Sequence, residues 1–291
     1  MPQVPESGAG HREFEAGRDL PQHRLHQAGG FSPITAAHNM SVVRFKRQWW
    51  AALDYEFTPD GFCDDETYDR LPPLPEHMFT GRFDWLTARP AGTDAHFMEP
   101  VPVPKHALHQ VDRRLARSGL ALPASFVTFM SSAELQRRVP SVTGNGWKMS
   151  DLAPSPVEEH GFLLRFMHDQ QGCWFYYLYL AADGSCPVLG SAELFTPDAD
   201  DDPEEASAFS PIDFLRSATW AAPDFEQFIY RYWIENLVCH HMIVQERPAC
   251  DLPVPAQEYV KLLQTPNRPP LNVWPQPLQW LNDNPDQLKL W

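Results

Sequence analysis

The stretch that decides the fold is Phe162-Leu-Leu-Arg-Phe-Met167, followed by the loop His168-Asp-Gln-Gln-Gly172 and the run Cys173-Trp-Phe-Tyr-Tyr-Leu-Tyr-Leu180. In the first run Phe162, Leu164 and Phe166 alternate with Leu163, Arg165 and Met167, and the second run is almost wholly aromatic or apolar, which is typical of buried strands. Two strands around a short loop predict a hairpin. The turn Ala181-Ala-Asp-Gly184 then leads to a third expected strand, Ser185 to Leu189. The sequence therefore predicts an antiparallel meander with a face covered by helices.

The covering helices are expected on both sides of this meander along the chain. Apolar residues at three- and four-residue intervals predict helices from Lys105 to Ser118 and from Asp224, a good N-cap, to about Gln245. Pro123 suits a first helical turn and predicts a shorter helix from Ser125 to Met130. The last long helix supplies an apolar face made of Phe225, Phe228, Ile229, Tyr232, Trp233, Leu237 and Met242. We expect Phe228 and Tyr232 to be buried against the strand from Trp174 to Leu180.

The composition indicates a protein that mostly folds. The chain has 291 residues, of which 43% are hydrophobic, and it contains ten tryptophans, which is too much apolar surface for a disordered chain. No stretch approaches the roughly 20 apolar residues of a membrane span, and the first residues do not resemble a secretory signal, so we expect a cytoplasmic location. The cysteines are odd in number and lack CxxC spacing, which predicts reduced thiols. They are Cys63, Cys173, Cys186, Cys239 and Cys250.

The negative charge is concentrated in two windows that contain no Lys or Arg. The formal net charge is −15, which disfavours nucleic acid and anionic lipid as partners and favours a basic protein. The acids are Asp54, Glu56, Asp60, Asp64, Asp65, Glu66 and Asp69 in the first window, and Glu193, Asp198, Asp200, Asp201, Asp202, Glu204 and Glu205 in the second. A charge run of this kind is either a solvated loop or a docking surface, and both readings remain open.

Four segments are expected along the chain. Residues 1–39 are predicted to be a disordered extension, and Met40 is a candidate natural start. Residues 40–100 form an aromatic and acidic segment that packs on the core, with a short helix near 42–54. Residues 101–247 form the α+β domain. Residues 248–291 form a Pro-rich wrap with a short helix near 257–264.

The order of these features resembles the SMI1/KNR4 (SUKH) family. The resemblance lies in three places: Leu122-Pro123 before a helix, the run from Gly161 to Leu180, and Phe225-Glu-Gln-Phe-Ile-Tyr-Arg-Tyr-Trp-Ile-Glu-Asn236. It covers about half of the chain, and no single motif is specific on its own. The resemblance implies one α+β domain, no known enzymatic activity and, in bacteria, a frequent role as an immunity protein that binds and blocks a toxin, often a nuclease. In fungi, relatives act in cell-wall signalling.

The candidate catalytic and metal-binding motifs are weak. Thr143-Gly-Asn-Gly-Trp147 lacks the lysine and serine of a phosphate-binding loop, so a turn is favoured. The cluster Cys239-His240-His241, with Glu246 and Cys250 nearby, has the composition of a metal site, but helical neighbours point about 100° apart and cannot share one ion. His168 and Asp169 lack a matching nucleophile. A ligand pocket lined by Trp174, Tyr176 and Tyr179 is less expected than core packing. The sequence thus assigns no catalytic residue, no metal and no cofactor.

Three functions of different classes remain open at this point. The first is a non-enzymatic immunity protein that binds a basic toxin through the partner-binding residues Asp200, Asp201, Asp202, Glu204 and Glu205. The second is a regulatory or scaffolding protein of the same fold, and the third is a hydrolase or metal enzyme whose site the sequence hides. If the acidic residues only keep the chain in solution, the aromatic surface around Trp49, Trp50 and Trp85 is the alternative interface. The oligomeric state is left open.

Overall fold

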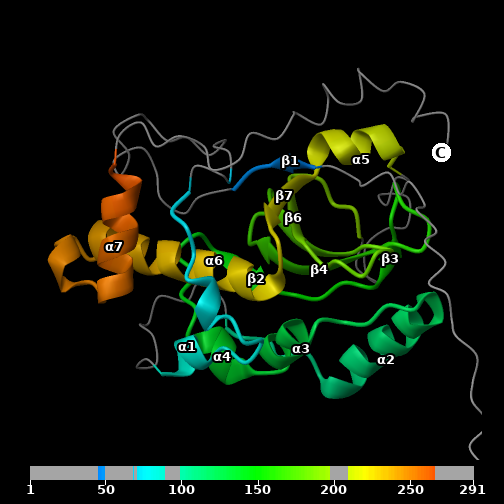
Figure 1. Cartoon of the computed structure of the whole chain (residues 1–291), viewed down its shortest axis with the longest axis horizontal. Coiled ribbons are helices and arrows are strands. Elements are labelled where there is room, and N and C mark those ends of the chain that lie inside the picture. The colour runs from blue at the N-terminus through cyan, green and yellow to red at the C-terminus, as the bar shows by residue number, and fades with distance from the viewer. Residues whose placement is uncertain (1–44, 50–67, 69–70, 89–98, 197–208, 266–291) are drawn as a thin grey trace, which may run out of the picture. The chain divides into compact units, whose positions relative to one another are not determined.

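The computed structural model describes residues 45–49, 68, 71–88, 99–196 and 209–265. The chain divides into two compact units, residues 1–41 and 42–291, and every described residue belongs to the second. This unit has an α+β fold, as predicted, built on one mixed sheet (Figure 1). Its strands are β1 Lys46–Arg47, β2 Asn145–Trp147, β3 Ala153–Pro154, β4 Phe162–Asp169, β5 Phe175–Leu180, β6 Val188–Ser191 and β7 Thr219–Ala222.

Helices surround the sheet and connect its strands (Figure 1). The α-helices are α1 Asp84–Thr87, α2 Lys105–Leu115, α3 Ala124–Met130, α4 Ala133–Arg137, α5 Pro211–Ser217, α6 Phe225–Cys239 and α7 Val254–Leu263. Shorter turns are η3 Glu76–Met78, η4 Ala116–Ser118, the π-helical η5 His240–Val244 and η6 Ala249–Asp251. Among the described residues, no helix combines the length and apolar character that a bilayer span requires.

The predicted meander is confirmed. Within the described residues the strand order is β1-β7-β6-β5-β4-β2, with β3 also pairing with β4. Strands β4, β5 and β6 pair antiparallel in sequence order. The predicted strand at 173–180 begins two residues later, because the Asp169 carboxylate accepts the backbone N–H groups of Cys173 and Trp174 and holds them in the turn. The third strand lies at Val188–Ser191 rather than at 185–189.

One face of the sheet packs on α6 and forms the larger core. Phe228 of α6 contacts the ring of Tyr176 on β5, with a centroid distance of 4.8 Å, and stacks on Tyr232. All three side chains are buried, so the predicted packing of this helix on the second strand of the hairpin is confirmed. Asp224 caps α6 as predicted, since its side chain accepts the Gln227 N–H.

The opposite face packs on α5 and forms a second, smaller core. Tyr177, Tyr179 and Leu189 lie in it with Phe214 of α5. The strands β4 and β5 are therefore covered on both sides, which explains why their sequences are apolar at both alternate sets of positions.

A β-bulge changes the alternation in β4. Arg165 pairs with Tyr177 but Met167 pairs with Tyr176, so Phe166 is an extra residue on β4. Phe166 and Met167 consequently both join the α6-side core. Strict alternation had grouped Met167 with Leu163 and Arg165, and this grouping is wrong because the bulge adds one residue to the period of two.

The predicted helix near 42–54 is wrong for the residues that the structure describes there. Lys46 and Arg47 form β1, which pairs in parallel with Thr219 and Trp220 of β7. The local pattern contained no sign of this pairing because the partner strand lies far along the chain. The helices predicted at 105–118, 125–130 and 257–264 are present at closely similar bounds. The helix predicted from Asp224 to Gln245 is α6 continued by η5.

Candidate functional site

Helix α6 buries charge as well as aromatic rings. Glu226, Arg231 and Glu235 are only 3%, 2% and 1% exposed. Moving an ionised side chain out of water costs several kcal/mol unless the charge is paired and hydrogen-bonded. The hydrogen-bond partners of these three residues therefore determine whether their charged groups are available for chemistry or are occupied in holding the fold together.

Glu226 is held by residues 81–85, a segment that lies far from it in the sequence. Its carboxylate accepts the backbone N–H groups of Gly81 and Phe83 and, at 3.0 Å, the indole Nε1–H of Trp85. Phe83 adopts a left-handed conformation with φ of 59°, which is unusual for an aromatic residue. Three donors directed at one carboxylate compensate its burial, so Glu226 serves as an anchor for this segment.

Glu235 and Arg231 form a second buried polar group, one turn of α6 apart. The Glu235 carboxylate accepts the Nε1–H of Trp49 at 2.8 Å and the hydroxyl of Tyr259 at 2.5 Å. Arg231 donates to Tyr259 Oη at 2.9 Å and to the carbonyl of Pro72 at 3.0 Å. Its guanidinium also lies 4.8 Å from the centre of the Tyr68 ring.

These contacts keep Arg231 charged. Burial alone would lower the pKa of its guanidinium, but Tyr259, Tyr68 and Glu235 raise it, and the net shift is upward. The hydroxyl of Tyr259 has its pKa raised well above the ordinary value by burial and by Glu235. At neutral pH Arg231 is therefore a cation, and Tyr259 is a neutral phenol that accepts a hydrogen bond from Arg231 and donates one to Glu235.

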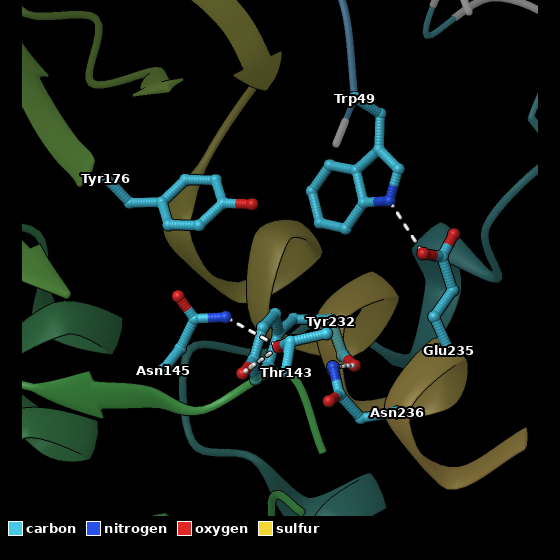
Figure 2. Close-up of a pocket in the computed structure, with 7 residues that line it drawn as sticks. All are labelled: Trp49, Thr143, Asn145, Tyr176, Tyr232, Glu235 and Asn236. Atoms are coloured by element: carbon cyan, nitrogen blue, oxygen red, sulfur yellow. Dashed lines mark hydrogen bonds between the residues drawn. The ribbon is translucent and has the colours of Figure 1, made fainter. Parts of the chain in front are cut away.

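A small pocket opens beside this group, between α6, β5 and the loop before β2 (Figure 2). Its lining is rich in hydroxyl, amide and carboxylate groups, contributed by Trp49, Thr143, Asn145, Tyr176, Tyr232, Glu235 and Asn236. The pocket has room for about one water molecule. A metabolite-sized ligand does not fit in it.

The polar atoms around this pocket mostly bond to each other. Tyr232 Oη lies 3.0 Å from Ser141 Oγ, and Asn236 Oδ1 accepts the backbone N–H of Val142 at 2.9 Å. Asn145 donates to Thr143 Oγ1 at 2.6 Å, as Figure 2 shows. Burial raises the pKa of Tyr232, so its phenol stays protonated. The arrangement ties the loop before β2 to α6.

The residues that the sequence singled out for chemistry are dispersed or occupied. Tyr176 lines the pocket, whereas Tyr179 lies in the core on the other face of the sheet. The carboxylate of Asp169 is used in its own turn. The sequence Asn145-Gly-Trp147, expected to be part of a turn, is strand β2, which pairs with β4.

The cysteine and histidine cluster near the end of α6 does not converge. Cys239 is buried in the α6-side core, whereas Cys250 is exposed. His241 Nε2 lies 3.1 Å from the carbonyl oxygen of Pro248, and burial lowers the pKa of His240. In the described part of the chain, no group of three or more His, Cys, Asp or Glu side chains is arranged to hold a metal ion.

The five predicted partner-binding acids lie outside the described residues, but the residues on either side of them are described. Tyr177 Oη donates to the carbonyl of Glu193 at 2.8 Å and accepts the N–H of Phe195 at 3.0 Å. The ring of Phe195 contacts those of Phe209 and Phe214, with centroid distances of 4.9 and 4.7 Å. We name Tyr177, Phe195, Phe209 and Phe214 the aromatic stem. Its rings hold the described residues before Asp198 and after Glu205 against each other and against the sheet, and Phe195 and Phe209 were the sequence signal for it.

The alternative aromatic interface is wrong for the two of its residues that are described. Trp49 and Trp85 are 2% and 5% exposed, and their indole N–H groups bond to the buried glutamates of α6. Trp50 lies outside the described residues. Comparison with protein-family models, with curated proteins and with solved structures finds no match for this chain.

Proposed function

We propose that the protein is a non-enzymatic binding module that engages a basic protein through its second acidic window. The observation that carries this proposal is the aromatic stem. A run of carboxylates without any Lys or Arg begins and ends at residues whose rings contact each other and the sheet. The stem holds the described residues on either side of the window against the sheet, which a segment that only aids solubility does not require.

The chemistry of the window suits a cationic surface. Asp200, Asp201, Asp202, Glu204 and Glu205 provide five carboxylates within six residues, and carboxylates form charge-assisted hydrogen bonds with Lys and Arg. A concentrated negative field also steers a basic partner during diffusion. The active cleft of a nuclease is such a surface, because it is built to bind phosphates.

The resemblance to SMI1/KNR4 proteins supports a toxin as the partner. In the proposed role the protein acts as an immunity protein in the cytoplasm and covers the basic cleft of the toxin. The buried carboxylates Glu226 and Glu235 support this non-enzymatic assignment, since both are engaged by donors from the chain itself.

The test is a kinetic comparison of two variants with the same change of net charge. The first neutralises the window (Asp200→Asn, Asp201→Asn, Asp202→Asn, Glu204→Gln, Glu205→Gln). The matched control neutralises five exposed acids elsewhere (Glu76→Gln, Glu99→Gln, Asp151→Asn, Glu159→Gln, Glu258→Gln). The probe is a basic nuclease, and its association with each variant is followed by stopped-flow fluorescence at low and high salt.

We expect the window variant to associate about 10- to 100-fold more slowly at low salt and with a flatter salt dependence, at a nearly unchanged Tm. The control should lose much less. Equal losses in both variants would mean that only net charge matters, and an unchanged on-rate in the window variant would remove the window from the interface.

A further inference from the structure

Helix α2 carries a basic face on an acidic protein. Its buried residues Leu108, Val111 and Leu115 lie on one side of the helix. The opposite side presents His106, His109, Arg113 and Arg117, all exposed and spaced by three or four positions along α2 and η4. We name these four residues the basic face.

No acid interrupts the basic face. Asp112 is the one acidic residue from Lys105 to Ser118, and its carboxylate is turned to accept the N–H of Leu122 at 2.9 Å. With Lys105, Arg113, Arg114 and Arg117, this stretch has a formal charge of +3, whereas the whole chain has −15. The positive charge of this stretch is therefore separated along the sequence from the two acidic windows.

The stability of α2 explains only part of this pattern. Arg113 and Arg117, near the C-terminal end, interact favourably with the helix dipole. Lys105 lies in the first turn, where a cation is unfavourable, and the N-cap Pro104 provides no side-chain hydrogen bond there. Helix stability therefore does not account for the cation at this end of α2, which favours a surface that contacts something negative.

We propose that the basic face binds the second acidic window of another copy of this chain. That window holds six acids in the eight residues from Asp198 to Glu205, and the aromatic stem holds the described residues on either side of these acids. The contact joins two different surfaces, so association proceeds head to tail and forms short chains unless a ring closes. The window is also the proposed partner site, and self-association therefore competes with the basic partner.

The strength of this contact is set by opposing electrostatic effects. Exposed ion pairs contribute up to about 1 kcal/mol each, while the net negative charge of each copy repels the other. Salt at about 0.1 M limits the net repulsion to roughly 10 Å and leaves contacts at shorter range less screened. We therefore expect reversible self-association that weakens as salt is added.

The test uses the purified full chain alone, so it is independent of the proposed basic partner. Sedimentation velocity is measured over a range of concentrations at about 50 and 500 mM NaCl, values chosen to lengthen and shorten the screening distance. Wild-type protein should show a concentration-dependent rise in sedimentation coefficient at the lower salt that is lost at the higher salt. Arg113→Glu/Arg117→Glu should weaken self-association by about tenfold or more.

The matched control is Arg247→Glu/Lys261→Glu, which changes the net charge equally at exposed positions outside α2. It should retain most of the association. Adding Asp200→Lys/Asp201→Lys/Asp202→Lys/Glu204→Lys to the Arg113→Glu/Arg117→Glu variant leaves Asp198 and Glu205 as the acids of the window, so that the window becomes net positive opposite a negative α2 face, and it should restore the association. Circular dichroism establishes that each variant is folded. If Arg113→Glu/Arg117→Glu does not fold, Arg113→Gln/Arg117→Gln is measured in its place.

Three outcomes would overturn the proposal. These are a wild-type chain that stays monomeric at both salt concentrations, equal losses in the α2 variant and the control, and a charge swap that fails to restore association. Loss of toxin binding in the window variant with no self-association in any variant would support the proposed function and refute this inference.

Discussion

Helices α6 and α2 use charged residues in opposite ways. On α6, Glu226, Arg231 and Glu235 are buried and each is bonded to a group far away in the sequence. On α2, Arg113 and Arg117 are exposed and contribute little to the packing of the helix. The difference teaches that the same residue types fix the fold on one helix and stay in contact with solvent on the other, and that burial and bonding, not composition, separate the two cases.

The largest effect should follow from removing the buried cation of α6. Arg231→Met leaves Glu235 without its nearby positive charge and Pro72 without a donor. Breaking a buried charged group typically costs about 3 to 5 kcal/mol, and urea unfolding measures the loss. Adding Glu235→Gln should recover part of it. A variant as stable as wild type would mean that the charge of Arg231 is dispensable.

Alkaline pH should destabilise the α6 side of the core by a similar amount. Burial raises the pKa of Tyr176, Tyr232 and Tyr259. Their stabilising effect is therefore complete below the unfolded pKa of about 10 and is lost as the pH rises above it. Each tyrosine that stays protonated in the folded state contributes up to roughly 1.4 kcal/mol for a rise of one pH unit above 10, so we expect urea unfolding to show a loss of up to about 4 kcal/mol at pH 11. Tyr232→Phe should reduce the slope.

Truncation of one α6 aromatic should have the next largest effect. Tyr232→Ala removes a ring stacked on Phe228 and the bond to Ser141, and we expect a loss of about 3 kcal/mol. Tyr232→Phe keeps the ring and should lose only about 1 kcal/mol. Thermal unfolding compares the two. Equal losses would assign the effect to the hydroxyl rather than to packing.

A milder change on α6 tests its anchoring of residues 81–85. Glu226→Gln keeps the shape but replaces a charged acceptor by a neutral amide, and we expect a loss of about 1 to 2 kcal/mol. Faster hydrogen exchange at Phe83 and Trp85 should accompany it. Unchanged exchange there would show that packing alone holds the segment.

The smallest effect is expected on α2. Arg113→Ala and Arg117→Ala should change the free energy of unfolding by less than about 0.5 kcal/mol, because exposed charges rarely contribute more. Chemical denaturation provides the measurement. A loss comparable to that of Arg231→Met would end the distinction between the two helices.

The sequence was sufficient for the parts of the fold that have a long local pattern. The hairpin β4–β5 and helix α6 carry such patterns over eight or more residues, so their pairing and packing were predicted. Strand β1 has two residues and depends on β7, a four-residue strand that lies far along the chain. Neither strand has a local period long enough to recognise.

The buried tryptophans could not be predicted for a related reason. Whether Trp49 and Trp85 face solvent depends on Glu235 and Glu226, which are 186 and 141 positions away. The sequence contained one signal of these contacts, namely the glutamates in an otherwise apolar helix, because a buried carboxylate needs hydrogen-bond donors. The identity of that donor is a property of the tertiary structure.

The distance in sequence between each tryptophan and its glutamate also determines the order in which the two residues are synthesised. Trp49 leaves the ribosome long before Glu235 exists, and at the usual rate of 5 to 20 residues per second the interval is about 10 to 40 s. During that time its ring and that of Trp85 have no native site, and they are available to chaperones. The N-terminal segment is thus made early and docked late, so translation speed should influence the yield of native protein more through residues 45–88 than through the hairpin.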